Sequence, residues 1–181
     1  TFQVRQAYMS HPIAYKQLAN HLGVELGDRV EATDLRQAVL ELRRSKGMVL
    51  DPADHNTWSS GSFFTNPVLT QEQADKLPGE APRFEVTDHS MIVGTRPAPV
   101  VPGLVKTSAA WLIQHAGFCP GFALGDAAPA SLSSVYVLAI TNRGNASAAD
   151  IEALAKTVIA GVRDKYGLTL VPEPVRVGLD F

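Results

Sequence analysis

Residues 147–167 constrain the fold of this chain more than any other stretch of its sequence. Ser147, with Asp150 three residues later, is typical of a helix start, and Gly167 is typical of a helix end. Between them, six side chains follow a helical stripe: Ile151, Leu154, Ala155, Val158, Val162 and Tyr166. Such a stripe has to be buried against other elements, so we predict a long amphipathic helix that packs on the rest of the domain.

The remaining predicted elements are shorter, and helices alternate with strands. Helices are expected at 15–22, at 34–44 after an N-cap at Thr33, directly after Thr70, and at 109–116 after an N-cap at Ser108. Short strands are expected at 62–65, 84–86, 135–141, 168–170 and 175–177, and residues 79–104 are interpreted as an extended surface excursion. This alternation, with irregular connections and no internal repeat, predicts an α+β domain whose helices pack on a small, mostly antiparallel sheet.

Composition restricts the class of protein and of partner. With 181 residues, 45% of them hydrophobic and 19% charged, and a net charge of −2, the chain is typical of a soluble globular domain. The basic residues are scattered, so nucleic acid is not expected as a partner. Apolar runs such as 135–140 are far shorter than the roughly 20 residues that span a bilayer, so no membrane segment is expected. The lone Cys119 fits a reducing compartment, which favours the cytoplasm.

No metal-binding or nucleotide-binding motif stands out in the sequence. The five His residues show no pair at metal-ligand spacing, and a single cysteine adds no cluster of soft ligands, so we expect no metal site. Neither of the common glycine-rich phosphate-binding patterns occurs. A cofactor is therefore expected to be held by other means or by another part of the protein.

Two polar side chains, Ser62 and Glu173, occupy unusual sequence environments. Ser62 lies in S-G-S-F-F, and an unpaired buried hydroxyl costs about 1 to 3 kcal/mol, so either the fold pairs it or it faces a site. Glu173 lies between Pro172 and Pro174, which restrict the backbone to an extended conformation and so aim the carboxylate. The residues alone leave a structural Ser62 and a solvated Glu173 as open alternatives.

Six segments of the chain, taken in order, resemble the C-terminal half of the UDP-N-acetylenolpyruvoylglucosamine reductase family. They are I-A-Y-K-Q-L, L-R-R-S-K-G, G-S-F-F-T-N-P, K-T-S-A-A-W-L-I-Q-H-A-G-F, V-L-A-I-T-N-R-G-N-A-S-A-A-D-I and P-E-P-V-R-V-G. The resemblance runs from about residue 15 to residue 178, and its most specific parts are G-S-F-F-T-N-P and A-A-W-L-I. Members of this family are flavoenzymes that make UDP-N-acetylmuramate for peptidoglycan.

The resemblance implies a reaction and a role for five residues. In this family FAD, reduced by NADPH, passes a hydride to the β-carbon of UDP-N-acetylglucosamine-enolpyruvate, and a Ser protonates the α-carbon. Ser62 matches that Ser and Glu173 matches the second acid of the family. Tyr15, Lys46 and Asn66 match positions that hold the UDP-sugar, against ordinary alternatives in which they are a half-buried Tyr, a surface Lys and a turn Asn.

The resemblance also implies a domain organisation. Residues 1–5 alternate like a strand already in progress and have no initiator Met, so we interpret the chain as a fragment. Residues 1–8 would be the end strand of a missing N-terminal FAD-binding part, which would hold most of the FAD, and residues 9–181 would be the C-terminal substrate-binding domain. A non-catalytic nucleotide-sugar-binding domain of the same fold and an unrelated α+β interaction module are the alternatives.

Two places depart from the family pattern. Residues 133–136 read S-S-V-Y, where the family usually has a His or Gln just before an apolar strand. Cys119 and Pro120 stand where small or basic residues are commoner. We expect these departures to alter local contacts to the substrate.

Overall fold

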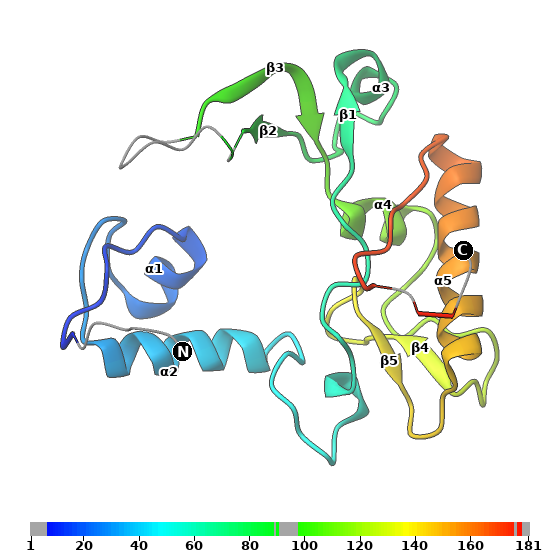
Figure 1. Ribbon diagram of the computed structural model, residues 1–181, viewed down its shortest axis with the longest axis horizontal. Coiled ribbons are helices and arrows are strands. Elements are labelled where there is room, and N and C mark those ends of the chain that lie inside the picture. The colour runs from blue at the N-terminus through cyan, green and yellow to red at the C-terminus, as the bar shows by residue number, and fades with distance from the viewer. Residues whose placement is uncertain (1–6, 89, 91–97, 176, 179–181) are drawn as a thin grey trace. The chain divides into compact units, whose positions relative to one another are not determined.

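The computed structural model describes residues 7–88, 90, 98–175 and 177–178, and its backbone divides into two units (Figure 1). The N-terminal unit is Thr1–Asp51 and the C-terminal unit is Pro52–Phe181. The strand predicted at 1–5 lies outside the described residues. The two units are described separately below.

The N-terminal unit contains two helices, α1 (Lys16–Leu22) and α2 (Ala32–Arg44). Helix α1 ends as predicted, because Gly23 adopts the left-handed conformation with φ of 68°. The predicted N-cap at Thr33 is wrong: α2 already begins at Ala32, and Glu31 occupies the N-cap position without a capping side-chain bond. The backbone provides the reason, since the Ala32 N–H donates to the Tyr8 carbonyl at 2.8 Å. Pairing with this earlier segment therefore fixes the start of α2 in place of a side-chain cap.

The described part of the C-terminal unit is built from short antiparallel strands, the α-helices α3, α4 and α5, and a short 3-10 helix, η1. Strands β1, β3 and β2 form one sheet in that order, and β4 pairs with β5 in a second sheet. Helix α5 packs against α4, β4 and β5 (Figure 1). The α+β class with small antiparallel sheets is confirmed. The bounds are η1 His55–Thr57, β1 Val68–Thr70, α3 Gln71–Asp75, β2 Phe84–Thr87, β3 Val100–Lys106, α4 Ala109–His115, β4 Ala130–Leu132, β5 Ile140–Asn142 and α5 Ala148–Tyr166.

Helix α5 follows the prediction made from its apolar stripe. The Ser147 hydroxyl accepts the Asp150 N–H at 3.3 Å, and the Asp150 carboxylate accepts the Ser147 N–H at 2.8 Å, so the two residues form a capping box. Hydrogen bonds from Ser147 lower the pKa of the Asp150 carboxyl below its ordinary value. The stability that these bonds add is therefore present at a pH above the ordinary pKa of Asp, and it is lost as the pH falls through the lowered pKa. Four side chains of the stripe are fully buried: Leu154, Ala155, Val158 and Val162.

The strand predicted at 135–141 is shorter than expected, and only β5 remains of it. The segment before it turns instead, because the buried Ser133 hydroxyl accepts the N–H groups of Val135 and Tyr136, each at 3.2 Å. The Ser133 N–H in turn donates to the Ala139 carbonyl at 2.8 Å. Local hydrogen bonds from one serine thus replace the strand ladder.

The strands predicted at 62–65 and near the C-terminus are also reduced. The 62–65 segment makes one antiparallel bridge, between Phe64 and Pro172. Proline has no N–H to donate to a ladder, so the two prolines that flank Glu173 limit the pairing. Val175 and Val177 belong to no strand in the described part of the chain and are 91% and 87% exposed, so the strand predicted at 175–177 is wrong there.

We predict that Gly161→Ala destabilises the protein although it adds a better helix former to α5. A Cβ at this position would lie 2.5 Å from two ring carbons of Phe118, a buried ring that packs edge-on against Phe122. Overpacking of this kind costs about 1–3 kcal/mol, which exceeds the roughly 1 kcal/mol that Ala gains over Gly in a helix. Urea unfolding measures the balance.

Gly79→Ala is the matched control, because a Cβ at Gly79 would meet nothing within 4 Å. We expect a change within about 0.5 kcal/mol there. A Gly161→Ala variant that is more stable than the wild type would show that the ring of Phe118 does not pack against α5.

Candidate functional site

The backbone of Phe63 joins the segment that carries Ser62 to two others, the segment of Leu138 and the segment of Glu173. Its N–H donates to the Leu138 carbonyl at 2.8 Å, and its carbonyl accepts the Glu173 N–H at 2.9 Å. Its side chain is buried, as is that of Phe64, and the two rings pack edge-on with centroids 5.1 Å apart. A residue anchored through both its backbone and its ring leaves little freedom to its neighbour Ser62.

Ser62 itself is half-buried and paired by the fold. Its Oγ lies 3.2 Å from the hydroxyl oxygen of Tyr136, and either group can donate. A serine hydroxyl offers one donor and two acceptor positions, so this single bond leaves capacity for another group. The fold therefore gives Ser62 a structural partner and leaves its side chain partly accessible.

Glu173 reaches the same place through its backbone. The Glu173 N–H donates to the Phe63 carbonyl, and the preceding Pro172 forms a bridge with Phe64. The side chain of Glu173 is exposed. The structure thus holds the backbone of Glu173 against the residue that follows Ser62. A carboxylate and a hydroxyl are carried by adjoining backbone segments.

Asn66 has a structural role that the sequence did not indicate. Its side-chain oxygen accepts the N–H of Ala109, the first residue of α4, at 2.9 Å. Ser108 caps the same helix by accepting the Trp111 N–H at 3.2 Å. The bond to Ala109 uses only the carbonyl oxygen of Asn66, and an amide side chain also carries two N–H donors.

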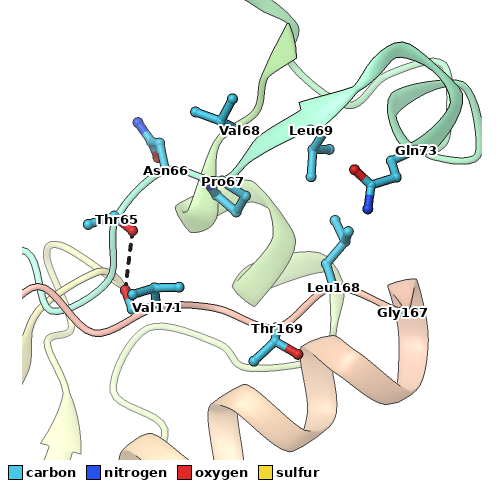
Figure 2. Close-up of a pocket in the computed structure, with 10 residues that line it drawn as sticks. All are labelled: Thr65, Asn66, Pro67, Val68, Leu69, Gln73, Gly167, Leu168, Thr169 and Val171. Carbon is cyan, nitrogen blue, oxygen red and sulfur yellow. Dashed lines mark hydrogen bonds between the residues drawn. The ribbon is translucent and has the colours of Figure 1, made fainter. Parts of the chain in front are cut away.

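A cavity of about 480 Å³ lies beside Asn66 (Figure 2). Two of its polar side chains already serve the fold, because the Thr65 hydroxyl donates to the Val171 carbonyl at 3.3 Å and Gln73 belongs to the capping box of α3. Ser62 and Glu173 are not among its lining residues. We therefore take the surroundings of Phe63 as the candidate site. The lining residues are Thr65, Asn66, Pro67, Val68, Leu69, Gln73, Gly167, Leu168, Thr169 and Val171.

The N-terminal unit brings Tyr15 and Lys46 to one end of α1. Tyr15 occupies the N-cap position of α1, and its side chain is 76% exposed. Lys46 lies in the turn after α2, and its ammonium donates to the Gln17 side-chain oxygen at 3.1 Å. A cation and an exposed aromatic ring therefore lie within one turn of the same helix.

Three helix starts in the described part of the chain, those of α2, α4 and α5, are poorly suited to hold the phosphates of FAD. Ser108 and Asn66 take N–H groups at the start of α4, and Ser147 takes one at the start of α5, where the Asp150 carboxylate would also repel an anion. Helix α2 begins after an acidic residue, Glu31. Within the described residues, no group of three His, Cys, Asp or Glu side chains gathers at a metal-binding distance. No helix of the described part of the chain is long and apolar enough to cross a membrane.

Comparison with known proteins gives a consistent result. The family model for "UDP-N-acetylenolpyruvoylglucosamine reductase, C-terminal domain" matches residues 51–177. Proteins named UDP-N-acetylenolpyruvoylglucosamine reductase are 51% identical in Cutibacterium acnes over 98% of this chain, 51% in Streptomyces coelicolor over 94%, and 49% in Thermobifida fusca over 98%. The chain covers 43%, 43% and 48% of these relatives, so it spans less than half of their length.

We predict that Asn66→Ala lowers the free energy of unfolding by about 1–2 kcal/mol, because the Ala109 N–H loses its acceptor in a fully buried position. Asn66→Asp is the control: it keeps the acceptor and places a negative charge at a helix start, so its stability should be close to that of the wild type. Urea unfolding compares the two variants. Equal stability of Asn66→Ala and the wild type would contradict the structural role of this side chain.

Proposed function

The chain belongs to the family of UDP-N-acetylenolpyruvoylglucosamine reductase C-terminal domains, and we propose that it is the substrate-binding and proton-donating part of such a reductase. The full-length enzyme would use NADPH and FAD to reduce UDP-N-acetylglucosamine-enolpyruvate to UDP-N-acetylmuramate for peptidoglycan synthesis. The names and the greater length of the relatives support this proposal. An N-terminal FAD-binding part would end in residues 1–8 and would hold most of the FAD, and this boundary remains a prediction.

One observation carries the proposal more than any other: the two hydrogen bonds of the Phe63 backbone. They tie the neighbour of Ser62 to Glu173 on one side and to the segment that carries Tyr136 on the other. Catalysis by positioned acids requires that each acid be held by a rigid part of the fold. The buried ring of Phe63 meets that requirement for Ser62.

The FAD-binding part would hold the flavin, which, when reduced by NADPH, would supply hydride chemistry at the substrate β-carbon. Ser62 then protonates the α-carbon: the electron pair on that carbon forms the new C–H bond, and the Ser62 O–H bond breaks. A serine hydroxyl is a poor acid, so this step requires that the developing carbanion be enolate-like, with its charge shared by the substrate carboxylate. We assign Glu173 to stabilise or protonate this enolic species.

Three further residues would hold the UDP-sugar. The Lys46 ammonium can exchange its bond with Gln17 for bonds to the diphosphate, since an ammonium has three donors and a compact charge. The exposed Tyr15 offers a ring and a hydroxyl. The amide N–H groups of Asn66 can donate to the substrate while its oxygen remains on Ala109.

We also propose a cytoplasmic location. Cys119 is a free, exposed cysteine, which suits a reducing compartment.

We predict that Ser62→Ala in the full-length protein leaves the reduction of the flavin by NADPH intact, because that half-reaction needs no proton at the substrate α-carbon. Reoxidation of the reduced flavin by the substrate should slow by about 10²- to 10⁴-fold, the usual contribution of a positioned general acid. Ser62→Cys should recover part of the rate, since a thiol is a better acid in nearly the same place. Stopped-flow absorbance separates the two half-reactions.

Ser60→Ala, two residues earlier on an exposed position, should leave both half-reactions unchanged. Reoxidation of the Ser62→Ala protein at the wild-type rate would reject Ser62 as the proton donor. A non-catalytic nucleotide-sugar-binding role would instead be indicated if the wild-type full-length protein binds the substrate without oxidising its reduced flavin.

A further inference from the structure

We propose that Tyr136 is a positioning residue for Ser62. In this proposal its phenol donates a hydrogen bond to the Ser62 oxygen and returns a proton to that oxygen after Ser62 has protonated the substrate. The inference rests on the proposed function of Ser62 and adds a residue that the resemblance does not assign. Residues 133–136 are the place where the chain departs from the family pattern.

The contact between the two hydroxyls is supported by the backbone beside it. The Tyr136 and Ser62 oxygens lie 3.2 Å apart, and the Phe63 N–H bond to the Leu138 carbonyl holds the two segments together one and two residues further along. The ring of Tyr136 packs against the hydrophobic core. A ring fixed by the core and a backbone fixed by Phe63 hold the phenol in one place.

The turn that carries Tyr136 is itself rigid. The Tyr136 N–H donates to the fully buried Ser133 hydroxyl at 3.2 Å, and the Tyr136 carbonyl accepts the Ala139 N–H at 2.9 Å. The Ser133 N–H closes the turn by donating to the Ala139 carbonyl at 2.8 Å. Both backbone groups of Tyr136 are therefore held, which is the support expected of a residue that must keep another side chain oriented.

The chemistry gives this contact a purpose beyond packing. If the phenol donates to the Ser62 oxygen, the serine O–H is left to point away from Tyr136, toward a substrate carbon. When that proton moves to the α-carbon, the serine oxygen keeps the electron pair of the broken O–H bond and becomes an alkoxide. A phenol is a much stronger acid than an aliphatic alcohol, so the Tyr136 proton passes to the alkoxide, and the phenolate regains a proton from water.

The test uses Tyr136→Phe in the full-length protein, a change that keeps the ring and removes only the hydroxyl. We expect flavin reduction by NADPH and substrate binding by calorimetry to be unchanged. Reoxidation by substrate should slow by about 10- to 100-fold, the rate equivalent of one hydrogen bond to a charged oxygen, so kcat falls while KM does not rise. Tyr166→Phe is the matched control, because Tyr166 packs against Trp111 at the end of α5 and should change the rate less than about twofold.

Repeating the Tyr136→Phe change in the Ser62→Cys protein separates a role of Tyr136 in proton transfer from a role in packing. A thiolate is stable without a phenol beside it, so in the Ser62→Cys protein we expect Tyr136→Phe to slow reoxidation less than about threefold. Equal losses in the wild-type and Ser62→Cys backgrounds would show that Tyr136 acts only by packing and would overturn the proposal. A wild-type rate for Tyr136→Phe, together with a slow Ser62→Ala protein, would also overturn it while leaving the proposed function intact. A wild-type rate for Ser62→Ala would reject the proposed role of Ser62 itself.

Discussion

The candidate site depends on the two hydrogen bonds made by the backbone of one buried residue, Phe63. Its N–H and its carbonyl bond to two segments that are far apart in the sequence. The N–H donates to Leu138, and the carbonyl accepts the N–H of Glu173. Its ring is part of the core, which also contains α4 and α5 side chains. The position of Ser62 is therefore set by packing that involves most of the C-terminal unit.

The polar side chains of the candidate site, such as Glu173 and Tyr136, lie on segments that do not form regular strands. Pro172 and Pro174 interrupt pairing beside Glu173, and the Ser133 turn interrupts pairing beside Tyr136. A regular ladder at these places would use the backbone groups that now hold the three segments around Phe63. The irregular backbone is thus compatible with a site, whereas β4 and β5 pair regularly under α5.

The sequence predicts those parts of the fold whose causes are local. Helix α5 follows from its stripe and its capping box, and α1 ends at Gly23 because glycine adopts a positive φ without strain. Strands β1 and β4 were not predicted, since each has three residues and is defined by its partner strand. Strand β3 contains Pro102 and Gly103 and falls largely within the stretch interpreted as an extended surface excursion, yet it lies between β1 and β2. Long-range pairing overrides local preference in these strands.

The same distinction holds for the candidate site. The resemblance named Ser62, Glu173, Tyr15, Lys46 and Asn66 one by one, but it gave no contacts among them. The bonds from Ser62 to Tyr136 and from Asn66 to Ala109 join residues 74 and 43 positions apart, and no periodicity reports such contacts. The S-S-V-Y departure was visible in the sequence, whereas the partner of its tyrosine required the fold.

The most direct measurement of the central claim is a crystal structure of the full-length protein with FAD and UDP-N-acetylglucosamine-enolpyruvate bound. We expect the Ser62 Oγ to lie about 3–3.5 Å from the substrate α-carbon, the separation of a near-attack geometry. We also expect the Tyr136 hydroxyl to remain in contact with that oxygen from the other side. An enolpyruvyl group bound away from Ser62, with the serine facing only Tyr136, would contradict the proposed role of Ser62.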